Sequence, residues 1–347
     1  MSVPKSNMRY VRLGKSGLKV SKIILGTMQY GSTDWASWVL PEEEAIKHIK
    51  FAWEHGITTF DTANCYSNGV SETILGKAIE ELGLPREELV IMTKVYFATP
   101  DDPAESLFRK GLTPADVGII NQHGLNRKHI FDSVKASLKR LQLDYIDVLQ
   151  CHRFDYETPI EETMRALDDL VKAGYVRYIG MSSCHAYQFH QMQTYALAHN
   201  LTPFVSMQNH YNLAYREEER EMFPTLAHFG VGAIPWSPLA RGLLTRPATA
   251  AAQTTRGQGD WYMPYKDQST TDVIAKVEEV AKRKGVSMAQ VAVAWMLSKP
   301  GVTAPIVGTT SLANLEDILG GLDVQLTEDE IKELEAPYRP QPIMGHD

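Results

Sequence analysis

The sequence has few cysteines, no surplus of positive charge and no long apolar run. Its three cysteines, Cys65, Cys151 and Cys184, are widely spaced without a Cys-x-x-Cys pair, which argues against a disulfide framework and a structural zinc site. A formal net charge of -7 argues against the basic surface that nucleic acids require. No apolar run could span a bilayer or serve as a signal peptide. We therefore expect a cytoplasmic protein without a metal, nucleic-acid or membrane partner.

Several common nucleotide and catalytic motifs are also missing. The sequence contains no Gly-x-Gly-x-x-Gly, no phosphate-binding loop, no His-Glu-x-x-His and no Gly-x-Ser-x-Gly. The chain therefore lacks the usual signatures of Rossmann dehydrogenases, kinases and serine hydrolases. Any nucleotide that binds this chain must be held by other means.

Short apolar segments of strand length alternate with helical stretches along most of the 347 residues, 44% of which are hydrophobic. Such nearly continuous apolar strands indicate a parallel sheet that helices cover. The expected strands are residues 21–27, 57–63, 89–95, 145–150, 176–181, 204–207, 231–235 and 304–307. Eight repeats favour a closed (β/α)8 TIM barrel over an open doubly wound sheet, built as a single domain over residues 1–347.

Two segments depart from this alternation. Residues 9–20 place Gly14-Lys15-Ser16-Gly17 between apolar arms, which predicts a β-hairpin that plugs the bottom of the barrel. Residues 246–270 show little periodicity and predict a long loop after the seventh strand. A loop of that length in a compact domain is usually a functional lid or a disordered stretch.

Four ionisable residues, Asp61, Tyr66, Lys94 and His152, lie at or just beyond the ends of three of these apolar segments. In a parallel barrel the carboxyl ends of the strands meet at one mouth, where active sites are built. Each residue alone has an ordinary explanation, such as a solvated lysine or a packed tyrosine. Together, a phenol, an ammonium, a carboxylate and an imidazole at one mouth predict a site that donates a proton to a carbonyl oxygen.

The same residues belong to an ordered set of motifs that resembles the aldo-keto reductases. The set runs through Gly26-Thr27, Phe60-Asp61-Thr62-Ala63, Tyr66, Lys94, His152, Ile179-Gly180-Met181-Ser182-Ser183 and Pro235-Trp236-Ser237-Pro238-Leu239. It covers nearly the whole chain. The stretch from Trp236 to Leu244 is similar to the branch that contains fungal and microbial reductases and potassium-channel β subunits.

The resemblance implies hydride transfer from a nicotinamide to a carbonyl carbon. It makes Tyr66 the general acid and His152 the group that orients the carbonyl. Lys94 would lower the pKa of the Tyr66 phenol, since a neighbouring positive charge favours the phenolate. Asp61 would hold Lys94 in place.

The resemblance also implies a set of cofactor contacts. In that set Trp236 stacks on the nicotinamide ring, while Ser182, Ser183 and Gln208 bind its carboxamide, although Ser183 stands where the family often has asparagine. The full set is Thr27, Met28, Asp61, Ser182, Ser183, Gln208, Trp236, Ser237, Pro238, Leu239, Arg241, Gly308, Thr310, Asn314 and Asp317.

The preferred nucleotide follows less directly from the resemblance. Thr310 occupies a position where the family often has a lysine or arginine that pairs with the 2′-phosphate of NADPH. We expect NADPH, with NADH not excluded.

The expected substrate is a small carbonyl compound, with Tyr30, Trp35, Tyr96 and Arg153 near the mouth. Aromatic walls of this kind suit aryl aldehydes and ketones. The sequence leaves two alternatives to an NADPH-dependent reductase. One is an NAD-linked alcohol dehydrogenase of the same fold, and the other is a nucleotide-binding regulatory protein similar to a channel β subunit.

Overall fold

A computed structural model describes residues 3–4, 6–260, 265 and 267–346. Eight parallel strands form one sheet in the order β10-β3-β4-β5-β6-β7-β8-β9. The strands are β3 (Ile24–Gly26), β4 (Thr59–Asp61), β5 (Val90–Val95), β6 (Ile146–Cys151), β7 (Val176–Ser182), β8 (Phe204–Gln208), β9 (Gly232–Ala233) and β10 (Ile306–Val307).

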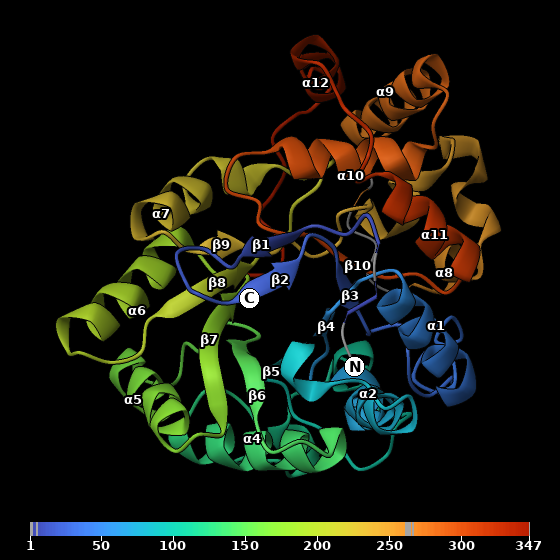
Figure 1. Ribbon diagram of the computed structural model, residues 1–347. Coiled ribbons are helices and arrows are strands. Elements are labelled where there is room, and N and C mark those ends of the chain that lie inside the picture. Colours follow the sequence, from blue (N-terminus) through green and yellow to red (C-terminus); the bar gives the residue numbers. More distant parts are fainter. Residues whose placement is uncertain (1–2, 5, 261–264, 266, 347) are drawn as a thin grey trace.

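Figure 1 shows the sheet curled into a barrel, and backbone hydrogen bonds join each end strand to the chain that flanks the other. The N–H of Ile306 donates to the carbonyl of Pro235 at 2.9 Å, and the N–H of Thr303 donates to that of Ala233 at 2.8 Å. The prediction of a (β/α)8 barrel is therefore confirmed.

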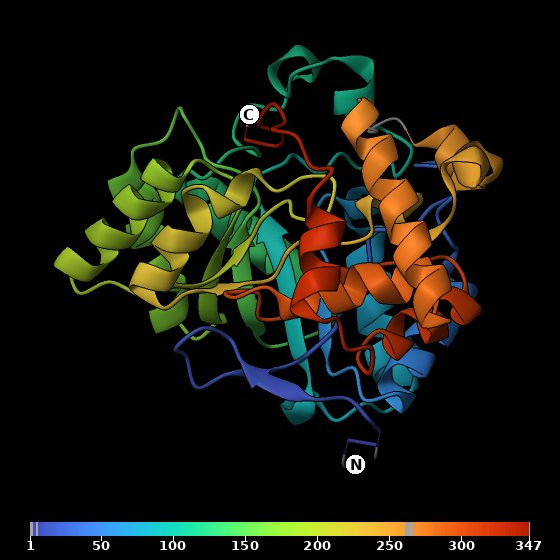
Figure 2. The same cartoon turned by 90° about the horizontal axis from the view of Figure 1, so that it is seen from above.

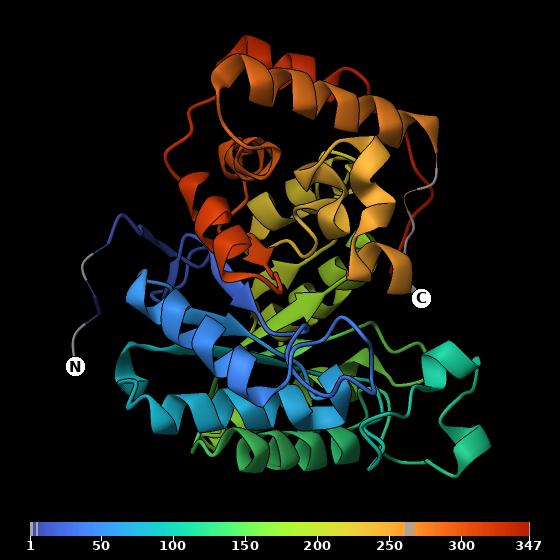
Figure 3. The same ribbon diagram turned by 90° about the vertical axis from the view of Figure 1, so that its right-hand side faces the viewer.

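Helices cover the outside of the strands, so the strands are buried on both faces. Every residue of β5 and β6 is buried, which explains why their sequences are mostly apolar. Figure 3 shows the blue and green helices on one side of the strands and the orange and red helices on the other. The main helices are α1 (Glu42–Glu54), α2 (Val70–Glu81), α4 (Arg127–Leu141), α5 (Ile160–Lys172), α6 (Ala186–Ala198), α7 (Met222–Phe229), α9 (Gln268–Lys284), α10 (Met288–Ser298), α11 (Leu312–Gly320) and α12 (Glu328–Glu335). Among the described residues, none of the helices is both long and apolar enough to cross a membrane.

The predicted hairpin closes one end of the barrel. Its antiparallel strands β1 (Tyr10–Arg12) and β2 (Lys19–Ser21) lie below the barrel in Figure 2, beside the N-terminus. Leu13 and Val20 are fully buried against Ile24, Val148 and Ile234 of the strands. Apolar packing at the bottom thus leaves the opposite end, where the strands terminate, as the mouth.

The segment after β9 contains more regular structure than the long loop expected at 246–270. It forms a 3-10 helix (Ala248–Gln253) and the short helix α8 (Thr255–Gly259), and α9 already begins at Gln268. Side-chain caps begin α8 and α9: Thr254 accepts a hydrogen bond from the N–H of Gly257, and Asp267 accepts one from the N–H of Thr270. The part of the prediction that falls on 261–264 and 266 lies outside the described residues.

Candidate active site

Three neighbouring strands bring the four predicted ionisable residues together at the mouth. Asp61 ends β4, Lys94 lies in β5, His152 directly follows β6, and Tyr66 begins the 3-10 turn Tyr66–Gly69. Lys94 Nζ is 2.6 Å from Asp61 Oδ2 and 3.2 Å from Tyr66 Oη. The Tyr66 and His152 rings meet edge to face with centroids 6.0 Å apart. One ammonium therefore contacts both the carboxylate and the phenol.

Two glutamines hold the other oxygen of the Asp61 carboxylate: Gln150, which we did not predict, and Gln208, which we predicted only as a cofactor contact. Gln150 Nε2 donates to Asp61 Oδ1 at 2.9 Å, and Gln208 Nε2 donates to the same atom at 2.8 Å. Gln208 Nε2 also lies 2.7 Å from Gln150 Oε1. Gln150 could have been found, because it is a polar residue near the end of an otherwise apolar strand.

Burial is the largest single influence on the pKa values of Tyr66, Lys94 and His152, and neighbouring charges oppose or reinforce it. It raises the pKa of Tyr66 above its ordinary value despite the opposing effect of Lys94. Lys94 thus acts on the pKa of the phenol in the expected direction, but burial outweighs it. Burial alone would lower the pKa of Lys94, but attraction to Asp61 and Tyr66 outweighs it and the pKa is raised. Burial, with Lys94 and Arg153 nearby, holds the pKa of His152 well below its usual range. At neutral pH the phenol is protonated, the ammonium charged and the imidazole neutral.

A stack of three rings supports Trp236 beside this cluster. The Trp236 ring lies 4.1 Å from His210 with planes 11° apart, and His210 stacks on Tyr215 at 4.3 Å. Trp236 Nε1 also donates to Ser183 Oγ at 3.0 Å. The indole is thus fixed at both its face and its edge.

The C-terminal segment reaches this ring stack, a contact that the sequence did not suggest. The N–H of Met344 donates to Tyr215 Oη at 3.1 Å. A Cβ atom on Gly345 would lie 3.5 Å from Trp236 and 3.8 Å from Ser183 Oγ. Figure 2 shows this red segment at the end of the barrel opposite the hairpin.

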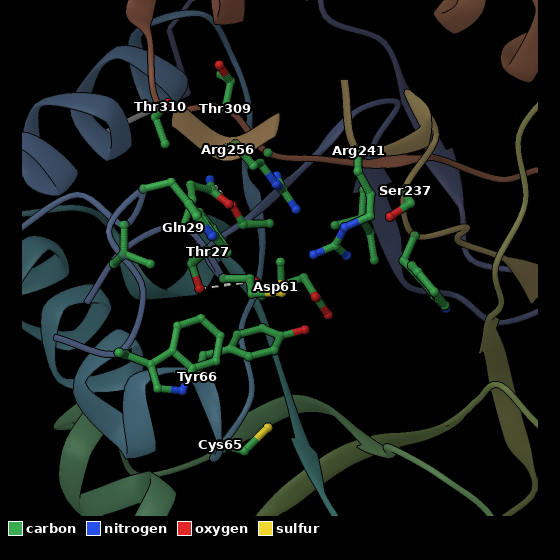
Figure 4. A pocket seen from close by; sticks show the side chains of 18 of the residues that line it. Thr27, Gln29, Asp61, Cys65, Tyr66, Ser237, Arg241, Arg256, Thr309 and Thr310 are labelled. Atoms are coloured by element: carbon green, nitrogen blue, oxygen red, sulfur yellow. Dashed lines mark hydrogen bonds between the residues drawn. The ribbon is translucent and has the colours of Figure 1, made fainter. Parts of the chain in front are cut away.

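A cavity of about 1080 Å³ extends from the ionisable cluster across the mouth, and Figure 4 shows part of its lining. Most of the predicted site residues line it: Thr27, Met28, Trp35, Asp61, Tyr66, His152, Arg153, Ser182, Gln208, Trp236, Ser237, Pro238, Leu239, Arg241, Gly308, Thr310, Asn314 and Asp317.

Three predicted ligand contacts, Tyr30, Tyr96 and Ser183, do not line this cavity. Tyr30 is fully buried and packs edge to face on His48 of α1, so it belongs to the core. Tyr96 packs against His123, which itself lines the cavity. Ser183 is buried and accepts the hydrogen bond from Trp236. Their proximity to the site in sequence did not reveal which way each side chain packs.

An ion cluster that the sequence did not suggest covers one side of the cavity. Arg241 donates to both oxygens of Asp260 at 2.6 and 2.7 Å, and Arg256 Nε donates to the same carboxylate at 3.0 Å. The Arg256 guanidinium lies 4.5 Å from the centre of the Trp38 ring. Figure 4 shows both arginines directed toward the cavity. Asp260 and Arg256 fall in the segment expected to be irregular, where no periodicity pointed to them.

Left-handed backbone marks the loop that carries Arg241. Ser237, Ala240 and Arg241 have φ values of 53°, 47° and 56°. Non-glycine residues in this region cost about 1–3 kcal/mol each and cluster at functional sites. The surrounding structure therefore holds this loop against its local preference, next to the cavity.

Comparison with known proteins agrees with this geometry. The sequence profile of the Aldo/keto reductase family matches residues 22–339. A Schizosaccharomyces pombe protein named as an aryl-alcohol dehydrogenase is 49% identical over 344 residues, which is 97% of each chain. Versiconal hemiacetal acetate reductase of Aspergillus parasiticus is 47% identical over 97% of this chain and 98% of its own. Aldo-keto reductase AFTS1 of Alternaria alternata is 46% identical over 99% and 96%. The chain therefore belongs to the aldo/keto reductase family and is an NAD(P)H-dependent oxidoreductase.

Proposed function

We propose that this chain uses NADPH to reduce an aldehyde or ketone to the alcohol. The observation that carries the proposal is the position of Lys94 Nζ, 2.6 Å from Asp61 and 3.2 Å from the Tyr66 phenol at the mouth of the cavity. A fixed ammonium beside a protonated phenol suits a reaction in which negative charge develops on a carbonyl oxygen.

Each residue of the cluster has a defined task in this reaction. Bound NADPH supplies the hydride to the carbonyl carbon. Tyr66 gives its proton to the oxygen, and the charge of Lys94 stabilises the phenolate that remains. His152 is neutral, so one ring nitrogen carries a hydrogen that it can donate. Its Nδ1 lies 3.8 Å from Cys65 Sγ, which leaves Nε2 for the carbonyl oxygen.

The chemistry along the cavity fits a nicotinamide dinucleotide. Near the ionisable cluster it offers the indole face of Trp236 and the hydroxyl and amide of Ser182 and Gln208, which suit a flat ring with a carboxamide. Thr310 and the N-terminus of α11 provide hydroxyl and N–H groups that suit a phosphate. A volume of about 1080 Å³ is at the upper end for a ligand site and leaves space for a substrate.

Arginines near the cavity support NADPH over NADH. Arg241, Arg246 and Arg256 all line it. Although Arg241 and Arg256 share the Asp260 carboxylate, the three arginines leave a net positive charge that Thr310 does not supply. An extra phosphate gains from charge-assisted hydrogen bonds. Initial rates with each nucleotide test this preference, and faster turnover with NADH would favour the NAD-linked dehydrogenase.

Aromatic carbonyl compounds are the substrates that the cavity suits best. Trp35, Trp38 and Phe97 line it together with apolar residues of the segment that follows β5. Two relatives are named for an aryl alcohol and for versiconal hemiacetal acetate. An aryl aldehyde is therefore the first compound to test.

The test is quenching of NADPH fluorescence by the purified protein, followed by addition of 4-nitrobenzaldehyde. We expect quenching on binding and then loss of NADPH that depends on the aldehyde. A sample without aldehyde is the control for background oxidation. Quenching without consumption across a panel of aldehydes would favour the regulatory alternative. If neither NADPH nor NADH is bound, the proposed function is wrong.

A further inference from the structure

Asn68 joins the turn that carries the proposed proton donor to the segment that follows β5. It lies two residues after Tyr66, and its Nδ2 donates to the backbone carbonyls of Asp102 at 2.7 Å and Glu105 at 2.8 Å. A carboxamide NH2 has two hydrogens, so both are directed at one short turn. The N–H of Glu105 donates to the carbonyl of Asp102, which keeps these two acceptors close together.

The backbone at Asn68 is left-handed, as are its two neighbours. Ser67, Asn68 and Gly69 have φ values of 47°, 49° and 95°. Asparagine is among the few side chains that enter this region readily. Ser67 Oγ accepts a hydrogen bond from the N–H of Ser32 at 3.2 Å, which helps to hold these three residues in the left-handed conformation. The Asn68 amide reaches the turn at 102–105, and Asn68 lines the cavity at this point.

That turn positions one wall of the cavity. The segment 96–124 contributes Leu107, Leu112, Pro114 and His123 to the lining. Its regular structure is limited to the four-residue helix α3 (Leu107–Lys110) and a 3-10 turn (Ala115–Val117). Figures 2 and 3 show it, in teal, projecting from the mouth end of the barrel.

Few apolar contacts fix the middle of this segment. Val117 is 45% exposed and Ile120 is 71% exposed. Asn64 Nδ2 donates to the carbonyl of Phe97 at 3.0 Å, but this contact lies at the base of the segment. Segments with little burial open at low free-energy cost, so the two hydrogen bonds to Asp102 and Glu105 matter for the position of this segment.

We propose that Asn68 is a positioning residue that determines substrate specificity by holding the 96–124 wall at a set distance from Tyr66. The proposal rests on the proposed function, because it assumes that the substrate lies between this wall and the phenol. Since Asn68 is attached to the turn of Tyr66, the proton donor and the wall are fixed relative to each other. Carbonyl compounds large enough to contact the wall depend on this anchor, and small ones do not.

Two variants test the anchor without forcing the backbone out of its conformation. Asn68→Gly keeps the left-handed φ and removes the amide. Asn68→Asp keeps the shape but replaces both hydrogens with a carboxylate oxygen that repels the two carbonyls. Asn200 is an exposed asparagine with φ 52° in the turn after α6, so Asn200→Gly is the matched control. The control should behave as the wild type in every assay.

The first measurement is limited trypsin digestion without any substrate, followed by mass spectrometry of cleavage after the exposed Arg109 and Lys110. We expect cleavage to be at least about five-fold faster in Asn68→Gly and faster still in Asn68→Asp, because each lost hydrogen bond favours the open segment. Cleavage within two-fold of wild type in both variants would overturn the proposal. This result does not depend on catalysis.

The second measurement compares 2-naphthaldehyde with propanal. In Asn68→Gly we expect kcat/KM to fall roughly ten-fold for 2-naphthaldehyde, mostly through KM, and less than two-fold for propanal. NADPH affinity should be unchanged. An equal loss for both aldehydes would contradict a role in specificity. If the wild type reduces neither aldehyde, the proposed function fails, and the digestion still decides whether Asn68 holds the wall.

Discussion

Replacing Lys94 with methionine would leave the Asp61 carboxylate buried without its cation. The lysine side chain is 0% exposed and the aspartate 2%, and their atoms are 2.6 Å apart. Removing one partner of such a pair typically costs about 3–5 kcal/mol, because the remaining charge stays desolvated. The donated hydrogen bonds of Gln150 and Gln208 remain, so we expect a value near the lower end.

This loss converts into a measurable shift of thermal unfolding. An unfolding entropy of about 2.1 cal/mol/K per residue gives roughly 0.7 kcal/mol/K for 347 residues. A loss of about 3–4 kcal/mol therefore lowers Tm by about 4–6 °C. Circular dichroism on heating, with and without urea, measures both quantities.

The double variant Asp61→Asn with Lys94→Met is the decisive comparison. It removes the buried charge while an amide oxygen can still accept from Gln150 and Gln208. We expect it to regain at least about half of the lost stability, which is roughly 1.5–2 kcal/mol relative to Lys94→Met alone. If the single variant costs less than about 1 kcal/mol, or if the double variant is no more stable than the single one, the pair is not the buried ion pair that we describe.

Two further substitutions test the protonation of the site. Tyr66→Phe should lower kcat by about 10²–10⁴ while NADPH affinity stays unchanged, because a proton donor is lost and the ring remains; near-normal turnover in steady-state assays would show that Tyr66 is not the general acid. We expect His210→Phe to weaken the dependence of stability on pH. Burial holds the pKa of His210 well below its usual range, so this histidine takes up a proton at a higher pH in the unfolded chain than in the folded one. The stability of the wild type therefore falls as the pH drops below about 6.5. Between pH 7 and 5.5 the wild type should lose about 1 kcal/mol more than the variant, and equal slopes of Tm against pH would contradict this.

The fold followed from the sequence because a parallel barrel repeats one pattern. Strands such as β5 and β6 are buried at every position and mostly apolar, and their few polar residues include Lys94 and Gln150 of the site. The shared direction of the strands then placed Asp61, Lys94 and His152 at one mouth. Parallel strands that are neighbours in the sheet necessarily end at the same edge.

Contacts between distant loops left no comparable signal in the sequence. Asn68 binds backbone carbonyls of Asp102 and Glu105, which any residue type could supply. Asp260 binds Arg241 across 19 positions, within a segment that has no periodicity. Tyr30 shows the converse limit, because only packing against His48 decides that it points into the core. Hydrophobic periodicity and strand direction predict where in the barrel a residue lies, but long-range packing decides which residues its side chain contacts.

The protonation of Tyr66 shows how burial changes the meaning of a recognised motif. A lysine beside a tyrosine suggests a lowered pKa, yet the phenol is buried deeply enough that its pKa is raised. A raised pKa keeps the proton on the phenol at neutral pH, where reduction of a carbonyl needs it. Oxidation of an alcohol needs the phenolate, which burial disfavours and which only Lys94 at 3.2 Å stabilises within this pair. Reduction leaves the same phenolate behind, so the charge of Lys94 serves both directions, and initial rates with carbonyl and alcohol substrates decide which one the chain catalyses faster.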